Sequence, residues 1–319
     1  MPLLEIKNLK LDFLSNGASL RAVDDVSLGL NAGETLCLVG ESGCGKSVTA
    51  LSIARLVPTP PARYAGGEIL LNGQDVLKMS KTELCNIRGG VVSYVFQEPG
   101  ASLNPVFRVG NQIKESLKLH RPKKANDEEV IRLLKLVGIP APESRIKDYP
   151  FQMSGGMQQR VMIAMALASE PKLLVADEPT TALDVTIQAQ ILELLRDPKQ
   201  RLGMAILLIT HNLGIVGDMA DRVAGMYAGQ IVESAPAREL LRRPLHPYTR
   251  ALINSVPKLI PQGQVRLSAI PGNVPRIGDF APGCRFYPRC PSAQPECANI
   301  MPELVEVEPG RWVRCLYAK

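Results

Sequence analysis

The stretch 172-KLLVADEPTTALD-184 combines an apolar strand with two adjacent acidic residues. Its run Leu173–Ala176 is typical of a strand that is buried on both faces. Asp177 and Glu178 follow that strand directly, at a place where carboxylates are costly unless they perform chemistry or remain in water. Taken alone, the pair is equally compatible with a catalytic site and with a solvated loop.

A second motif upstream favours the catalytic interpretation. Residues 40–47, GESGCGKS, match the phosphate-binding pattern G-x-x-x-x-G-K-[ST], and they lie between an apolar strand and the predicted helix SVTALSIARLV. Glycines let the backbone turn its N–H groups toward anionic oxygens, while Lys46 is placed for the β- and γ-phosphates and Ser47 for Mg²⁺. Beside such a loop, Asp177 is a metal-holding acid and Glu178 a candidate general base. The residues predicted to hold the nucleotide here are Gly40, Ser42, Gly43, Cys44, Gly45, Lys46, Ser47 and Val48.

Four weaker features accompany these two motifs. Phe13 could stack on a nucleotide base or belong to the core. Gln97 ends the apolar strand VVSYVF, where its amide could cap the strand, ligate Mg²⁺ or orient water, and the following EPGASLNPVFRVG is typical of a loop. The segment Ser154–Gly156 opens a helix with bare N–H groups, which suits an anion but would by itself more often be an ordinary helix start. His211 follows the strand LLIT and would usually be structural.

The order of these features resembles that of the ATP-binding cassette (ABC) ATPases, over about residues 3–235. The fold class implied is α/β, a P-loop ABC-type core with an antiparallel β subdomain, a helical subdomain at about 105–168 and an irregular cysteine-containing C-terminal extension. The motifs implied are a Walker A loop at 40–47, a Q-loop at Gln97, a signature motif at 153–157, a Walker B motif at 173–178, a D-loop at 182–184 and a switch histidine at His211.

The resemblance also assigns a role to each of these residues. Asp177 would hold Mg²⁺ together with Ser47 and Gln97, Glu178 would polarise the attacking water, and His211 would contact the γ-phosphate. The signature residues would complete an ATP site on a partner cassette, so that ATP is sandwiched between two cassettes that close and reopen. These partner-facing residues are Ser154, Gly155 and Gly156.

Longer stretches narrow the resemblance to one group of ABC proteins. GESGCGKSVTA, FQEPGASLNP, SGGMQQRVMIAMAL and ADEPTTALDVTIQAQIL look like the ATP-binding subunits of oligopeptide/dipeptide importers. The signature departs from the usual LSGGQ, since it reads MSGGM at 153–157. The partners implied are a second homologous ATPase in a heterodimer, two permeases and, indirectly, an extracytoplasmic substrate-binding protein. The implied location is the cytoplasmic face of the inner membrane. The implied cargo is a di- or oligopeptide, and the alternative is nickel, glutathione or another small solute.

Length and composition agree with this interpretation. The chain has 319 residues, and its longest apolar runs, at 161–168 and 204–209, are shorter than the roughly 18–20 residues of a membrane span. A net charge of +6 without a long basic block gives no reason to expect nucleic acid. Only 56 residues separate Gln97 from Ser154, too few for the coiled coil of a DNA-repair ABC ATPase. The chain also contains only one set of these motifs, whereas translation-associated ABC proteins carry two cassettes in one chain.

The composition changes after residue 235, so the predicted regions are a nucleotide-binding domain at 1–235 and an extension at 236–319. HPYTRALINSVP and GCRFYPRCP in the extension are similar to the C-terminal region of the importer group. Thirteen of the 26 prolines lie there, which predicts short helices at 236–243 and 248–255 followed by an irregular tail that could hardly bury a core of its own.

Four of the seven cysteines lie in that tail, at spacings C-x5-C-x6-C-x17-C. Structural zinc sites usually show tight C-x2–4-C pairs, which are absent here, and four irregularly spaced thiolates suit a [4Fe–4S] cluster at least as well. The resemblance to importer extensions also favours the cluster, with Zn²⁺ as the alternative. The expected ligands are Cys284, Cys290, Cys297 and Cys315.

Overall fold

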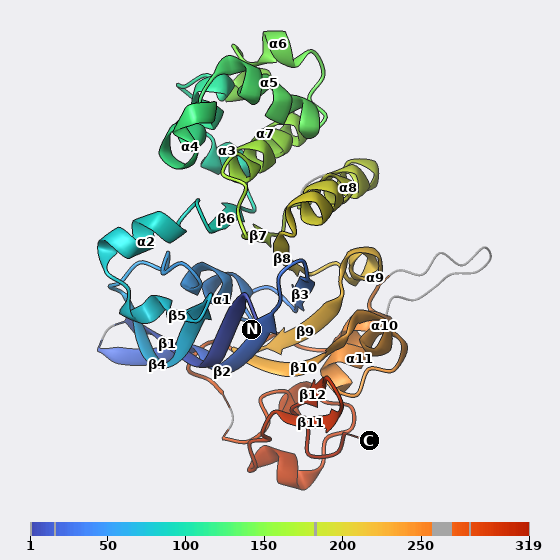
Figure 1. The fold of residues 1–319 in the computed structure, drawn as a ribbon. Helices are drawn as coiled ribbons and strands as arrows, with labels where there is room; N and C mark the ends of the chain where they lie inside the picture. Colours follow the sequence, from blue (N-terminus) through green and yellow to red (C-terminus); the bar gives the residue numbers. More distant parts are fainter. Residues whose placement is uncertain (1, 16, 182–183, 257–269, 281, 319) are drawn as a thin grey trace, which may run out of the picture. The chain divides into compact units, whose positions relative to one another are not determined.

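The computed structural model describes residues 2–15, 17–181, 184–256, 270–280 and 282–318. The chain forms two compact units, the first made of residues 1–30, 35–77 and 209–319, and the second of residues 31–34 and 78–208 (Figure 1). The C-terminal extension thus shares a unit with the phosphate loop, although the two are far apart in sequence.

The first unit contains an antiparallel sheet with the strand order β2-β1-β4-β5. Asn72 and Gly73 form the two-residue turn between its last two strands, with φ values of 49° and 79°. Both residues need positive φ in such a turn, which is why Asn-Gly is a strong hairpin signal. The strands are β1 (Leu4–Ser15), β2 (Ala18–Leu30), β4 (Ala62–Leu71) and β5 (Gln74–Asp75).

A second run of strands in this unit has the order β11-β12-β10-β9-β3. β3 is parallel to β9 and buried along its whole length, as the apolar sequence TLCLV requires. The strands are β3 (Thr35–Val39), β9 (Arg222–Tyr227), β10 (Gln230–Pro236), β11 (Val305–Glu308) and β12 (Arg311–Val313). The helices and helical turns are α1 (Lys46–Ser52), η1 (Val76–Lys78, at the junction with the second unit), η4 (Leu213–Ile215), α9 (Val216–Met219), α10 (Ala237–Arg242), α11 (Pro247–Asn254), η5 (Tyr287–Arg289) and η6 (Pro295–Ala298).

The second unit carries buried strands in the order β8-β7-β6 and a set of helices. Residues 98–110, expected to be a loop, include the short helix α3, which starts at Pro99 because proline suits the first helical turn. The strands are β6 (Val92–Val95), β7 (Leu173–Asp177) and β8 (Ala205–Thr210, whose last residues belong to the first unit). The helices and helical turns are α2 (Lys81–Ile87), α3 (Pro99–Ser102), α4 (Val109–His120), η2 (Pro122–Lys124), α5 (Asp127–Leu136), α6 (Pro142–Arg145), η3 (Pro150–Gln152), α7 (Gly155–Leu167) and α8 (Val185–Leu202).

The C-terminal extension differs in part from its prediction. The two short helices are confirmed as α10 and α11, but the tail is not without a core. β12 pairs with β10 through Val313 and Trp312, and the buried Phe286 packs edge-on against Tyr227 with ring centroids 5.2 Å apart. The tail therefore shares the core of the nucleotide-binding region instead of building a separate one. The stretch 258–269 of the predicted tail lies outside the described residues.

Candidate functional site

The phosphate loop follows β3 directly, and two of its glycines are required by the backbone. A Cβ atom on Gly40 would lie 2.3 Å from the carbonyl oxygen of Met226, so no larger residue fits there. Gly45 caps α1 with a φ of 106°, which is favourable only for glycine. The match to the phosphate-binding pattern thus corresponds to a tight turn between a buried strand and a helix, as the sequence predicts.

Lys46 lies inside this loop. Its side chain is 5% exposed, and its ammonium donates to the carbonyl oxygens of Gly40 (2.8 Å) and Glu41 (2.9 Å). The positive charge is thereby held where a loop of this kind encloses phosphate oxygens. Ser47 is exposed in the first turn of α1, where its hydroxyl is accessible to a metal ion.

The remaining loop residues differ in accessibility. Ser42 and Gly43 are exposed, whereas the Cys44 side chain is buried, and that burial raises the pKa of its thiol. Cys44 can therefore contribute its backbone rather than its sulfur to a ligand. Two more predicted site residues belong to the same unit, namely the half-buried Phe13 near the end of β1 and the exposed His211 directly after β8.

The Q-loop glutamine and the paired acids meet in the second unit. β6 and β7 are parallel neighbours whose register places Val95 beside Ala176, so Gln97 and Glu178, each two residues further on, end side by side. The Gln97 amide donates to the Glu178 carboxylate (Nε2–Oε2, 3.2 Å). Asp177 is half-buried at the end of β7.

Glu178 has an unusual backbone conformation, with a φ of 48°. Non-glycine residues with positive φ are uncommon, and such strain is concentrated at functional sites. Its carboxylate also accepts a hydrogen bond from the Thr181 hydroxyl at 2.8 Å. Thr181 was not singled out from the sequence, although its position three residues after Glu178 in the DEPTT run could have indicated it.

The signature segment opens α7 as predicted. Ser154 caps the helix and accepts a hydrogen bond from the Met157 N–H at 3.4 Å. Gly155 is exposed, with nothing within 4 Å of the position of a Cβ atom. The first turn of α7 therefore presents open backbone, and Gly156 beside it is half-buried. In the predicted D-loop, Asp184 caps α8, while residues 182–183 lie outside the described part of the chain.

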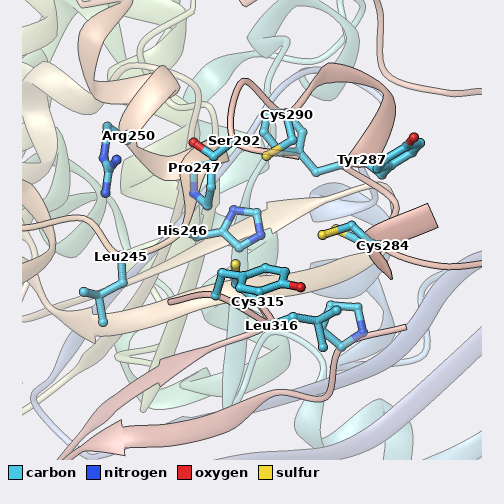
Figure 2. Close-up of a pocket in the computed structure, with 14 residues that line it drawn as sticks. Leu245, His246, Pro247, Arg250, Cys284, Tyr287, Cys290, Ser292, Cys315 and Leu316 are labelled. Atoms are coloured by element: carbon cyan, nitrogen blue, oxygen red, sulfur yellow. The ribbon is translucent and has the colours of Figure 1, made fainter. Parts of the chain in front are cut away.

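All four cysteines of the extension line one cavity of about 130 Å³ together with the buried His246 (Figure 2). Burial raises the pKa of Cys284, Cys290 and Cys315, so without a bound cation these groups remain thiols at neutral pH. Burial also lowers the pKa of His246 to about 3, which keeps the imidazole neutral. Across the described residues, no group of three or more His, Cys, Asp or Glu side chains is placed to hold a single metal ion.

Comparisons with known proteins agree with these features. Residues 23–181 match the ABC transporter family, and residues 232–297 match the family described as the oligopeptide/dipeptide transporter C-terminal region. A probable peptide ABC transporter ATP-binding protein of Sinorhizobium fredii is 49% identical over 98% of this chain and 94% of that protein. The oligopeptide transport ATP-binding protein AppD of Bacillus subtilis is 49% identical over 98% of this chain and 96% of its own length.

Solved structures show the same cassette fold. A dimeric structure of MJ0796, a bacterial ABC transporter cassette, has a TM-score of 0.65 and 25% identity, and covers 74% of this chain and 99% of that chain. A dimeric post-hydrolysis state of the same cassette, bound to ADP and Pi, has a TM-score of 0.64 and 26% identity, with the same coverage.

The class defined by this fold and these motifs is the ATPase cassette of ABC transporters. Within it, the chain belongs to the family of ATP-binding subunits that carry the oligopeptide/dipeptide transporter C-terminal region. It is an ATPase that powers an ABC importer. None of its described helices has the length and apolar character needed to cross a membrane.

Proposed function

We propose that this ATPase powers the import of di- or oligopeptides. This proposal is supported by relatives that are 47–49% identical over nearly the whole chain, all of them named as peptide, oligopeptide or dipeptide transport proteins. The same machinery could serve nickel, glutathione or another small solute, because the ATPase does not itself contact the cargo. The functional regions are residues 1–235 for nucleotide chemistry and 236–319 for the extension.

The test is uptake by a reconstituted transporter. We expect vesicles that contain the chain with its permeases and binding protein to accumulate a labelled dipeptide or oligopeptide only when ATP is supplied on the side of the ATPase. A complex that carries Lys46→Ala is the control for ATP dependence. Uptake of nickel or glutathione, without uptake of peptide, would assign the alternative cargo.

In the proposed ATP site, the loop backbone from Gly40 to Val48 and the Lys46 ammonium bind the phosphates, and Phe13 stacks on the base. Ser47, Gln97 and Asp177 offer hydroxyl, amide and carboxylate oxygens, which are the donors that Mg²⁺ prefers. Mg²⁺ would neutralise phosphate charge there. Glu178, held by Gln97 and Thr181, orients and deprotonates the attacking water, and His211 contacts the γ-phosphate. The residues that complete the site of a partner cassette are Ser154, Gly155 and Gly156.

The proposed partners are a second homologous ATPase, two permeases and, through them, a substrate-binding protein, with the chain bound peripherally to the cytoplasmic face of the inner membrane. Large apolar side chains exposed on the second unit support permease docking. Val106 and Phe151 are each 71% exposed and Phe107 is 54% exposed, so all three offer apolar surface that a partner could cover.

For the extension, we propose that its four cysteines bind one [4Fe–4S] cluster, with Zn²⁺ as the alternative. Their convergence on one cavity supports a shared ligand. A single zinc ion would need its sulfur ligands at about 2.3 Å and hence close to one another. Cys297 is buried and the other three are half-buried. Ligation would therefore add a cross-link to the contacts that already hold the tail.

Protein purified without oxygen should therefore be brown, absorb broadly near 400 nm and contain iron and sulfide in about equal amounts. Cys290→Ser should remove the colour and make the tail more sensitive to proteolysis. Cys85→Ser is the matched control, because Cys85 is exposed and outside the extension. Colourless protein with one zinc per chain would establish the alternative metal, and metal-free protein with fully reactive thiols would refute both.

A further inference from the structure

The C-terminal extension contacts the phosphate loop through an ion pair that is largely buried. Arg289, in η5, donates from Nη1 to Glu41 Oε2 (2.8 Å) and from Nη2 to Glu41 Oε1 (2.9 Å). The Arg289 side chain is 5% exposed and that of Glu41 28%, so solvent screens this pair only in part. Two parallel hydrogen bonds of this kind fix direction as well as charge.

A second contact from the extension reaches the same loop residue. The Glu41 backbone N–H donates to the hydroxyl of Tyr248 in α11 at 2.9 Å, and Tyr248 is fully buried. Tyr227 packs against Tyr248 with ring centroids 4.7 Å apart, and its hydroxyl accepts from Arg289 at 3.4 Å. The extension therefore holds both the backbone and the side chain of Glu41.

Glu41 is the second residue of the phosphate-binding pattern, and its carboxylate poses an electrostatic problem. A negative charge beside a loop that receives a polyphosphate repels that ligand, and the repulsion is strong where water is partly excluded. Within the loop, the Glu41 carbonyl also accepts the hydrogen bond from the Lys46 ammonium. A disturbance of Glu41 is therefore transmitted to the lysine that faces the phosphates.

We propose that Arg289 is a positioning residue for ATP binding, which neutralises Glu41 and holds the phosphate loop in its binding conformation. Through this pair, the extension controls the affinity of the ATP site. The proposal rests on the assignment of residues 40–47 as the phosphate site. It gives the extension a function in the nucleotide cycle, in addition to any role of its cysteines.

The test is equilibrium binding of nucleotides to the purified full-length chain. Arg289→Ala should weaken Mg·ATP binding by about tenfold, because it leaves the Glu41 charge without compensation. The loss should decrease from ATP to ADP and be absent for adenosine, which carries no phosphate. In steady-state hydrolysis, KM for ATP should rise while kcat changes little. Arg238→Ala, at an exposed arginine of α10, removes an equal charge from the extension and should bind ATP like the unaltered chain.

A double variant separates electrostatics from folding. Glu41→Gln/Arg289→Ala removes both charges, and it should recover most of the lost ATP affinity. The ATP affinity of Arg289→Lys should lie between that of the unaltered chain and that of Arg289→Ala. If the double variant binds ATP as weakly as Arg289→Ala, or if Arg289→Ala binds like Arg238→Ala, the proposal is wrong. Lys46→Ala tests the site itself. Unchanged ATP affinity in Lys46→Ala would refute the phosphate site, whereas its loss beside a normal Arg289→Ala would refute only the role of Arg289.

Discussion

Glu178→Gln should lower the rate of ATP hydrolysis by about 10²–10⁴-fold, the usual contribution of a general base. Glutamine keeps the size of the side chain, and its carbonyl oxygen can still accept the hydrogen bond that Thr181 donates to Glu178 at 2.8 Å. The amide cannot accept a proton from water, so the chemical step is lost while the surrounding geometry remains. Binding of Mg·ATP should persist, and the variant should accumulate as a closed, ATP-loaded dimer.

Two measurements check this expectation, namely single-turnover release of phosphate and sedimentation of the ATP-bound protein. Lys46→Ala is the informative comparison, because it removes a charge that contacts phosphate and should reduce ATP binding itself. If Glu178→Gln hydrolyses ATP at close to the normal rate, Glu178 is not the general base, even if the variant accumulates as a dimer.

Phe286→Ala should destabilise the extension by about 3–5 kcal/mol, the usual cost of truncating a buried phenylalanine. The ring is 1% exposed and lies 5.2 Å from Tyr227, 5.4 Å from Tyr248 and 5.9 Å from His246, measured between ring centroids. Its removal leaves a cavity among side chains that join the extension to the nucleotide-binding region. Thermal unfolding and the rate of limited proteolysis within residues 284–318 should both report the loss.

Phe151→Ala is the matched control, since the same truncation at a side chain that is 71% exposed should change stability little. Equal proteolysis of the two variants would contradict the view that the aromatic cluster holds the extension in place. The extension would then lack a supporting core, as its proline-rich composition predicts.

The sequence predicts local features of the site well, because they depend on short-range geometry. Gly40 and Gly45, for example, are both needed by one turn. The proximity of Gln97 and Glu178 follows from one further step, the parallel pairing of two strands that are each followed closely by one of these residues.

Contacts between distant segments could not be predicted in this way. Arg289 and Glu41 are 248 positions apart, and no periodicity or motif marks either of them as a partner of the other. The proline-rich composition of the tail also predicts less ordered structure than the tail has. Composition shows that a segment lacks apolar residues for a core of its own, but not that Phe286 fits among aromatic rings of another segment.

The hairpin formed by β11 and β12 has a consequence for self-association. β10 is buried almost throughout, and an open edge on such a strand would be a template for pairing with another copy of the chain. β12 covers part of that edge, and the outermost strand becomes β11, where Glu306 and Glu308 alternate with valines. This outermost strand is only four residues long and carries charged side chains, two features that limit pairing at the edge of a sheet. The last residues of the extension thus replace part of the open edge of β10 with a short, charged edge strand.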